Sequence, residues 1–383
     1  MLFRDRLTIT TVYRITGTGM TRAIFSWMAG LSCMLSAATW ADTSDYQLTN
    51  INPQPLHGPW TLVQLPDQSW VVTERRGNLV LIKPDGSMTR TKVPLPGLYF
   101  KGQGGLLDFA LAQDFALSGK VLLTYAQGTD EANRLVVVSA TYEDDALTDI
   151  TPILTLQPDR ATPVHFAGRL AVMSDGTWLV SSGDGFDYRE QAQVISSHLG
   201  KILRFREDGS PAQDHPFAEA PYVYSLGHRN PQGLLINPAT QQIIEHEHGP
   251  AGGDEINVIA AGENYGWPVI TNGKDYSGAR ITPFEQYAGM QQPAYDWTPS
   301  VAPSGMALYQ HTLFSELTGH LLVTTLKAQS LLSVNISGTP VRSERIFATI
   351  DQRLRDVAVG QDGAIYVLTD GSKAGIIKVT PAE

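Results

Sequence analysis

The chain has a single cysteine, Cys33, among its 383 residues, so it cannot form an intramolecular disulfide bond. Its stability must come from a packed core or from a bound metal. Charged residues make up only 17 % of the sequence, against roughly a quarter in average globular proteins, and apolar residues make up 42 %. This composition argues against disorder and against long charged helices, and it provides enough apolar surface for a large core.

Basic residues are also scarce, because 28 Lys and Arg stand against 38 Asp and Glu and give a net charge of −10. A nucleic-acid partner requires a basic face and is therefore not expected. Any anionic ligand must find a local basic pocket. Only one long apolar run is present, at 23–35, and with about 13 residues it is too short to span a bilayer.

The first 41 residues are typical of a secretory signal peptide. An arginine-rich region precedes the apolar run at 23–35, and the small-residue stretch 36–41 follows it. The alternative is a buried N-terminal helix, and Met20 is an alternative start. We expect residues 42–383 to form one exported domain, periplasmic or secreted, without cysteine and with 24 basic against 37 acidic residues.

The remaining chain repeats one pattern six times: a short apolar strand, a turn rich in Asp, Asn, Pro and Gly, and a second apolar strand. The copies lie at 60–74, 106–125, 169–184, 233–248, 305–325 and 354–370. Helical periodicity is nearly absent, apart from a short helix expected at 189–198. Repeated hairpins at intervals of about 57 residues predict an all-β, six-bladed β-propeller with four-stranded blades around a central channel. Two β-sandwich domains are the alternative, but no linker separates the units.

His165 and Asp184 flank one of these hairpins. One hairpin out and back brings both to the same end of a blade, where a carboxylate can fix the tautomer of an imidazole that acts as a general base. The loop 225–233 is rich in hydrogen-bonding side chains, among them the guanidinium group of Arg229 and the amide of Asn230. It is a candidate ligand-facing loop. A solvated loop of the same composition is the alternative.

The segment 245–255 combines carboxylates with glycines that expose carbonyl groups, which suits calcium. Zinc is an alternative, because His246 and His248 fall on one face of a strand, but no third ligand has an evident spacing. Further on, Lys327, Arg353 and Arg355 stand at corresponding blade ends. In an acidic chain these cations could converge on the channel as an anion pocket. Serine-hydrolase, phosphate-loop and dinucleotide fingerprints are absent.

Read in order, seven segments resemble the soluble quinoprotein sugar dehydrogenases of the glucose/sorbosone dehydrogenase family. The matching segments are Gln103-Gly-Gly-Leu-Leu-Asp-Phe-Ala, His165-Phe-Ala-Gly-Arg-Leu, Gly227-His-Arg-Asn-Pro-Gln-Gly, Glu245-His-Glu-His-Gly-Pro with Gly253-Asp-Glu-Ile-Asn, Asn264-Tyr-Gly-Trp-Pro, Val301-Ala-Pro-Ser-Gly-Met and Arg353-Leu-Arg-Asp-Val. The resemblance implies a six-bladed propeller that uses pyrroloquinoline quinone (PQQ) and Ca²⁺ to oxidise aldose sugars to lactones.

By this resemblance, His165 is the base that removes the anomeric proton, and Asp184 orients it. Arg229 and Asn230 bind and polarise the quinone, Gln103 is a further cofactor contact, and the PQQ carboxylates are held by three cations, Lys327, Arg353 and Arg355. The carbonyls of Gly249 and Pro250 correspond to ligands of a PQQ-bound calcium, and Glu255 with the Tyr265 backbone corresponds to a structural one.

The sequence departs from the glucose-selective branch of this family. The long blade insertions of that branch are missing, and Trp297-Thr298-Pro299-Ser300 stands in the region of an aromatic residue near the sugar. We therefore expect an open site of broad aldose specificity. We also expect the chain to be a monomer and to pass its electrons to an acceptor, which the sequence does not identify. The alternatives are a calcium-dependent propeller lactonase and a propeller that binds sugars or proteins without catalysis.

Overall fold

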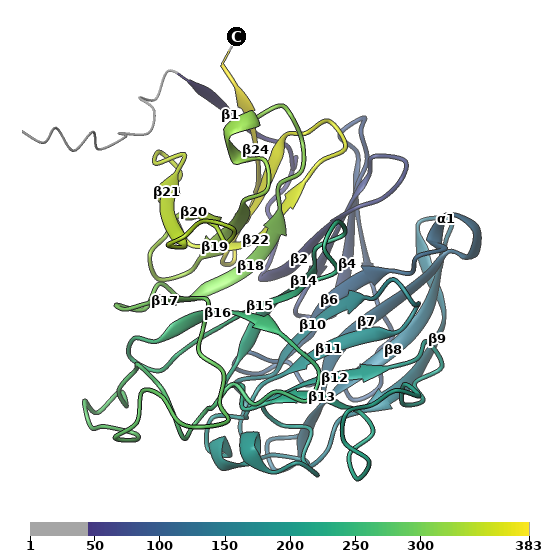
Figure 1. The fold of residues 1–383 in the computed structure, drawn as a ribbon. Helices are drawn as coiled ribbons and strands as arrows, with labels where there is room; N and C mark the ends of the chain where they lie inside the picture. Colours follow the sequence, from purple (N-terminus) through teal and green to yellow (C-terminus); the bar gives the residue numbers. More distant parts are fainter. Residues whose placement is uncertain (1–44, 383) are drawn as a thin grey trace, which may run out of the picture. The chain divides into compact units, whose positions relative to one another are not determined.

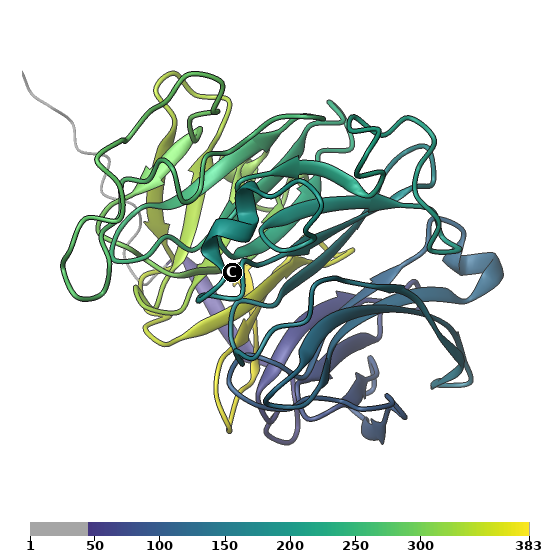
Figure 2. The same ribbon diagram turned by 90° about the horizontal axis from the view of Figure 1, so that it is seen from below.

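The computed structural model describes residues 45–382, which form six antiparallel four-stranded sheets arranged as the blades of a ring (Figures 1 and 2). The fold predicted from the repeats, a six-bladed β-propeller, is confirmed. The signal peptide expected at 1–41 lies outside the described residues. Within 45–382 no helix combines the length and the apolar character needed to cross a membrane.

Each blade runs outward from the ring centre, and its first strand is the innermost. Blade 1 contains β2 (Pro59–Gln64), β3 (Trp70–Glu74), β4 (Asn78–Ile82) and β5 (Met88–Lys92). Blade 2 contains β6 (Leu106–Leu111), β7 (Lys120–Gly128), β8 (Asn133–Glu143) and β9 (Ala146–Thr155). Blade 3 contains β10 (Ala167–Val172), β11 (Trp178–Ser182), β12 (Lys201–Phe205) and β13 (Val223–Leu226).

The second half of the ring follows the same plan. Blade 4 contains β14 (Pro231–Ile236), β15 (Ile243–Glu247), β16 (Asp254–Ile259) and β17 (Tyr295–Trp297). Blade 5 contains β18 (Pro303–Leu308), β19 (Leu321–Thr325), β20 (Leu331–Asn335) and β21 (Arg342–Ile346). Blade 6 contains β22 (Leu354–Val359), β23 (Ile365–Thr369), β24 (Ile376–Pro381) and β1 (Tyr46–Asn50). The helical segments described are α1 (Phe115–Ser118), η1 (Arg189–Gln193) and η2 (Ser315–Leu317), so the helix expected at 189–198 is a shorter 3₁₀ turn.

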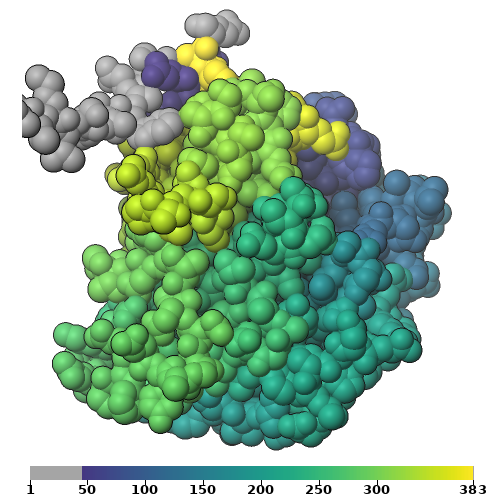
Figure 3. Space-filling model, in the orientation of Figure 1, coloured from purple at the N-terminus to yellow at the C-terminus, as the bar shows by residue number. Residues whose placement is uncertain are grey.

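The two ends of the described chain close the ring in blade 6. Strand β1 pairs antiparallel with β24, with Tyr46 opposite Pro381. The purple and yellow surfaces accordingly lie side by side in Figure 3. Each innermost strand also contacts the next one around the ring, from β2 through β22 and back to β2. The pairing of β1 covers the edge of β24, and each blade keeps only a short outer edge strand.

The six repeats found in the sequence are the two inner strands of each blade. In blade 3, for example, the repeat 169–184 covers β10 and β11, with Leu170 opposite Val180. Its Asp175-Gly176 turn places Gly176 at φ +81°, a backbone conformation that glycine adopts without steric cost. The alternating apolar residues of these hairpins therefore face the neighbouring blades and form the core.

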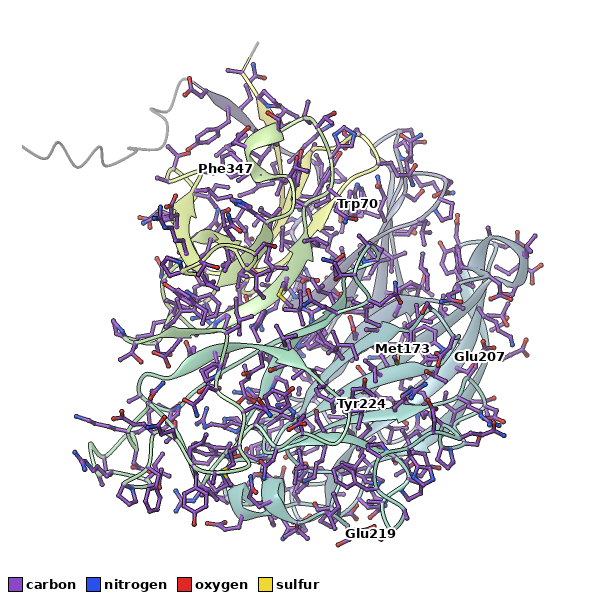
Figure 4. All side chains as sticks on the ribbon, in the orientation of Figure 1. Trp70, Met173, Glu207, Glu219, Tyr224 and Phe347 are labelled. Atoms are coloured by element: carbon purple, nitrogen blue, oxygen red, sulfur yellow. The ribbon has the colours of Figure 1, made fainter. Side chains whose placement is uncertain are left out.

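Aromatic and aliphatic side chains fill the spaces between blades. Trp70 of blade 1 packs on Tyr366 of blade 6, with ring centroids 4.3 Å apart. Met173 and Tyr224 belong to one apolar cluster between blades 3 and 4, and Phe347 lies 4.9 Å from the ring of Tyr46 (Figure 4). The core is thus distributed around the ring, and its centre is left to polar groups.

Arg169 of β10 occupies the central channel, the space enclosed by the six innermost strands. Its guanidinium lies 4.1 Å from the ring of Trp60 and is almost fully buried. It donates hydrogen bonds to one group from each of the other five blades: Thr61 Oγ1 (3.1 Å), Asp108 Oδ1 (3.4 Å), the Gln232 carbonyl (2.8 Å), the Ser304 carbonyl (3.2 Å) and Asp356 Oδ1 (3.0 Å). One side chain therefore ties all six blades together.

Candidate functional site

The loops at one end of the inner hairpins bring His165 and Asp184 together, as the sequence predicted. Nδ1 of His165 lies 2.7 Å from Oδ1 of Asp184, and both side chains are buried. Because a carboxylate only accepts hydrogen bonds, the imidazole carries its proton on Nδ1, and Nε2 keeps its lone pair. The pair has the arrangement of a general base and its orienting carboxylate.

Asp184 is held by three donors. Besides His165, it accepts from the Phe186 backbone N–H (2.7 Å) and from Trp267 Nε1 (2.8 Å). Burial alone raises the pKa of Asp184, but the hydrogen bond and the charge of His165, with Arg229 nearby, bring it below its usual value. Asp184 is therefore ionised at neutral pH. Trp267 is a site residue that the sequence reasoning missed, although it lies in the Asn264-Tyr-Gly-Trp-Pro motif.

The pKa of His165 is lowered, mainly by burial. Asp184 raises it, whereas the positive charges of Arg229 and Arg160 lower it further. Arg160 was not predicted from the sequence; it is fully buried and donates from Nη1 to the His165 carbonyl at 3.1 Å. The imidazole is consequently neutral at pH 7, which is the state that can accept a proton.

The backbone at His165 is strained, with φ +54°, a conformation that costs a non-glycine residue about 1 kcal/mol or more. Gln103 Oε1 accepts the His165 N–H at 2.7 Å and holds this conformation. Gly183 packs against the other side, where an added Cβ would overlap the His165 carbonyl oxygen. The sequence predicted Gln103 as a cofactor contact; it does line the cavity described below, and it also positions the base.

Arg229 and Asn230 follow β13 and lie beside the His165–Asp184 pair, called the dyad below, because the Arg229 carbonyl accepts the Asp184 N–H at 2.8 Å. Nη1 of Arg229 donates to the carbonyls of His248 (2.9 Å) and Gly249 (2.6 Å). Asn230 is almost fully buried and accepts from Gln232 Nε2 at 3.2 Å. The predicted ligand-facing loop is therefore packed against the base.

A cavity of about 450 Å³ opens at this end of the channel. Its lining includes four arginines, Arg75, Arg76, Arg353 and Arg355, together with Gln103, Asn230 and His248. Asp370 accepts from Arg353 Nε (3.0 Å) and from Arg355 Nη2 (2.9 Å) and so orients both guanidinium groups. Of the three cations expected to converge on one pocket, Lys327, Arg353 and Arg355, the structure places Arg353 and Arg355 in the lining of this cavity.

Two of these arginines, Arg75 and Arg76, were missed in the sequence. They directly follow β3, the second strand of blade 1, which is the position that Asp184 and His248 occupy after β11 and β15. Burial lowers the pKa of Arg75, and the positive charge of Arg355 lowers it further. Crowded guanidinium groups of this kind favour an anion between them. Lys327, predicted to join the group, is exposed and lies outside the set of residues that line the cavity.

The carbonyl groups expected to bind calcium lie next to Arg229. The Gly249 carbonyl accepts from Arg229, while its N–H donates to Asp254 Oδ1 at 2.8 Å. Asp254 also accepts from the Val301 and Ala302 N–H groups and so holds the 249–253 turn against blade 5. Pro250 lines a second cavity, described below. The Gly249 carbonyl, one of the two expected calcium ligands, thus accepts a hydrogen bond from the Arg229 guanidinium.

Glu255, expected to bind a structural calcium, lies on β16 directly opposite Glu247 of β15 and Asp296 of β17. Burial raises its pKa to about 8, and Asp296 and Asp254 contribute to the shift. Such crowding of carboxylates is relieved when a hard cation binds. Tyr265, the other expected contributor, stacks on the ring of His228 at 4.9 Å.

The zinc alternative finds no support at His246 and His248. Burial lowers the pKa of His246 to about 3 and that of His248 to about 4, so both imidazoles are neutral, which by itself would permit metal binding. Nε2 of His248 is hydrogen-bonded to the Pro303 carbonyl at 2.6 Å. The group of potential metal ligands found within 45–382 contains neither residue.

A second cavity, of about 280 Å³, is lined by three aromatic residues, Phe186, Trp267 and Tyr276, and by five charged ones, Asp187, Arg189, Glu190, Arg229 and Asp275, together with Pro250 and Ile281. Phe186, whose centroid is 5.2 Å from that of His165, stacks on Tyr276 at 6.2 Å. Arg229 and Trp267 complete this wall. Trp297, which stands in the expected region of the sugar-contacting aromatic, is instead buried between blades 4 and 5 and donates to Ser343 Oγ.

Together these features define a six-bladed propeller in which a buried His–Asp pair adjoins an arginine-lined cavity and a second cavity with an aromatic wall. The chain belongs to the glucose/sorbosone dehydrogenase family, whose family model, "Glucose / Sorbosone dehydrogenase", matches residues 56–378.

Similarity to individual proteins agrees with this assignment. The aldose sugar dehydrogenase YliI of Escherichia coli is 35 % identical over 358 residues, which cover 91 % of this chain and 96 % of the relative. The crystal structure of the soluble aldose sugar dehydrogenase from Escherichia coli in its apo form has a TM-score of 0.83 at 34 % identity, covering 88 % of this chain and 99 % of that one. The PQQ-bound aldose sugar dehydrogenase from Streptomyces coelicolor has a TM-score of 0.72 at 26 % identity, covering 89 % and 100 %.

Proposed function

We propose that the chain is a quinoprotein aldose sugar dehydrogenase, which oxidises aldoses at C1 to the corresponding lactones with PQQ and Ca²⁺. One observation carries the proposal: the buried, neutral imidazole of His165 is bonded to Asp184, and its immediate neighbours Gln103 and Phe186 line, respectively, a cavity with four arginines and a cavity with aromatic residues. Family membership and the PQQ-bound relative from Streptomyces coelicolor support this reading.

The arginine-lined cavity fits a tricarboxylate such as PQQ. The guanidinium groups of Arg353 and Arg355 are oriented by Asp370, and Arg75 lies close enough to Arg355 for their charges to repel. Carboxylates placed among them would form charge-assisted hydrogen bonds and remove that repulsion. PQQ, when bound, supplies the two-electron acceptor for the hydride from sugar C1.

The chain's own residues would handle the proton. His165 Nε2 accepts the proton of the anomeric hydroxyl, and the positive charge that develops on the ring is stabilised by Asp184 at 2.7 Å. Phe186 and Trp267 keep Asp184 in place through their N–H groups. Arg229, fixed by two carbonyl oxygens, presents positive charge where electron density builds up during the oxidation.

The carbonyl oxygens of Gly249 and Pro250 are the groups that would hold a calcium ion beside the cofactor. Calcium prefers oxygen ligands, and the turn 249–253 is anchored firmly by Asp254. Glu255, whose half-buried carboxyl is crowded by Asp254 and Asp296, would hold a second ion together with the Tyr265 carbonyl.

The substrate site would be the aromatic-lined cavity. Phe186 and Tyr276 form a stacked wall that suits the apolar face of a pyranose ring, and both remain substantially exposed, at 42 % and 65 %. A wall of this kind selects for a sugar ring more than for one hydroxyl pattern. It therefore favours broad aldose specificity, with electrons passing to an acceptor that approaches the open mouth.

The lactonase alternative requires free carboxylates in the channel to bind calcium. Within the described ring the channel carboxylates Asp108 and Asp356 are both engaged by Arg169, at 3.4 and 3.0 Å. A binding protein without catalysis would have no need for a strained, hydrogen-bonded base. Neither alternative accounts for the four arginines.

The proposal is tested by adding PQQ and Ca²⁺ to the purified apoprotein and following the reduction of a redox dye when an aldose is supplied. We expect dye reduction with several aldoses and none without PQQ. Bound PQQ without dye reduction on any of several aldoses would contradict the proposal.

A further inference from the structure

Blade 4 contains a second polar cluster, which shares no residue with the dyad or with the lining of the arginine-lined cavity. Glu245 and Glu247 alternate on β15 and therefore project from the same face of the sheet. His228, from the loop between β13 and β14, faces both of them: its Nδ1 lies 4.0 Å from Glu245 Oε2 and 3.9 Å from Glu247 Oε2. Ligand atoms from all three residues lie within 4.8 Å of one another.

The cluster is buried. The exposed fraction is 0 % for His228 and Glu245 and 4 % for Glu247. Two carboxylates removed from water need a compensating positive charge. The nearest basic side chains are engaged elsewhere, because Lys201 Nζ donates to three backbone carbonyls and the Arg229 guanidinium donates to those of His248 and Gly249.

Several atoms of the cluster lack a hydrogen-bond partner within the described ring. They are His228 Nδ1, Glu245 Oε1 and the neighbouring Asn257 Oδ1, all of them buried. Buried polar atoms are nearly always satisfied, so three orphans at one place require an explanation. The distances of 3.9 and 4.0 Å from Nδ1 to the carboxylates are too long for hydrogen bonds.

The orientation of His228 is set by its other nitrogen. Nε2 lies 2.8 Å from Ser225 Oγ, and the ring stacks on Tyr265. A metal ion at Nδ1 requires the tautomer in which Nε2–H donates to Ser225 Oγ, and Nδ1 then presents its lone pair toward the two carboxyl groups. A metal-binding histidine typically has this arrangement, in which one ring nitrogen is fixed by a hydrogen bond and the other is left free for the ion.

We propose that His228, Glu245 and Glu247 bind one divalent cation of the zinc class, with Asn257 Oδ1 as an additional oxygen. An imidazole nitrogen with two carboxylates suits Zn²⁺ or a similar transition metal better than Ca²⁺, which prefers oxygen ligands alone. The set shares no residue with the expected calcium ligands Gly249, Pro250, Glu255 and Tyr265, although Glu255 lies opposite Glu247 in the strand register.

An ion at this position would reinforce the loop that carries Arg229. Glu247 Oε2 accepts the Arg229 N–H at 2.7 Å, and the Arg229 carbonyl accepts the Asp184 N–H at 2.8 Å. Fixing Glu247 therefore fixes the backbone beside the dyad. The ion acts as a positioning element and does not touch the substrate.

The test uses the full chain, stripped of metal with a chelator and then dialysed against Zn²⁺ in the presence of excess Ca²⁺. We expect one tightly held zinc per chain. Loss of a group that supports a metal ligand weakens metal binding by about 10- to 100-fold. Glu245→Gln removes a ligand itself while keeping the shape of the side chain, so it should weaken zinc binding by more than this. The matched control is Glu316→Gln, at an exposed glutamate of η2, which should keep full stoichiometry.

A second measurement covers the case in which Glu245→Gln does not fold. Co²⁺ bound to the wild-type chain should give the visible absorption of a low-coordinate site with nitrogen and oxygen ligands, and Zn²⁺ should displace it. The proposal is overturned if the wild-type chain retains no zinc, if Ca²⁺ displaces the zinc, or if folded Glu245→Gln binds it as tightly as the wild type. The first of these outcomes would mean that the two carboxyl groups share a proton instead.

Discussion

Arg169 Nη2 donates to Asp356 Oδ1 at 3.0 Å across the central channel, joining blade 3 to blade 6. The same guanidinium contacts the other four blades, and both side chains of the pair are less than a tenth exposed. A buried ion pair of this kind adds little net energy compared with an apolar pair, but removal of one partner leaves an uncompensated charge. The closed ring therefore depends on Arg169 remaining in place.

We predict that Arg169→Met lowers the free energy of unfolding by about 3 to 5 kcal/mol, because Asp108 and Asp356 are left buried without a cation. The measurement is the shift of the denaturation midpoint in urea. Arg345→Met serves as the control, since Arg345 pairs with Asp351 at the surface, with 42 % and 74 % of the two side chains exposed. Its effect should be under about 1 kcal/mol. Equal shifts for the two variants would refute the central role of Arg169.

Gly183→Ala should lower turnover by about 100-fold, because the new Cβ would push the His165 carbonyl and misplace the base. Steady-state kinetics with saturating PQQ measure the effect. Gly176→Ala, at the turn of the same hairpin, meets nothing within 4 Å and has only its φ of +81° to oppose it. That variant should lose about 1 kcal/mol of stability and keep its turnover. Normal turnover in Gly183→Ala would show that the close contact between Gly183 and the His165 carbonyl does not position the base.

The pH profile should reflect His165. Burial lowers its pKa, and Arg229 and Arg160 reinforce the effect against the opposing influence of Asp184, so the neutral base persists below the ordinary histidine range. Turnover should therefore be constant through pH 6.5 and fall only as the pH drops through the lowered pKa. Asp184→Asn removes the carboxylate that raises the pKa of His165. The acid limb should therefore move to lower pH, and turnover should fall. An acid limb above pH 6.5 would contradict the assignment.

His165→Ala should lower turnover by about 100-fold or more, as expected for loss of a general base, without abolishing PQQ binding. Titration of PQQ followed by its absorbance separates the two properties. Wild-type turnover in this variant would remove His165 from the mechanism.

The arginines of the cavity should govern cofactor affinity. Arg355→Gln and Arg75→Gln should each weaken PQQ binding by about 10- to 100-fold, the value of a lost charge-assisted hydrogen bond. Lys327→Gln should change it by less than about threefold, because Lys327 is exposed and lies outside the cavity lining. Calorimetric titration with PQQ measures the affinity of each variant. A large loss of affinity in Lys327→Gln would restore the role that the family resemblance gives to Lys327.

Much of the fold could be predicted from the sequence because each blade repeats its inner hairpin, as at 169–184 and 354–370. The closing pair β1–β24 could not, since Tyr46 and Pro381 are brought together only by the complete ring. The dyad could be predicted from the sequence because only one hairpin separates His165 from Asp184. The contact of Trp267 with Asp184, across 83 residues, depends on how the long segment between β16 and β17 folds back.

The most direct test of the central claim is the reduction of protein-bound PQQ by an aldose deuterated at C1, compared with the same aldose deuterated at C2. The account predicts rapid reduction that is slowed by deuterium at C1 only, with the C1 lactone as product. Unchanged rates with the C1-deuterated sugar together with a product other than the lactone, or bound PQQ that no aldose reduces, would contradict it.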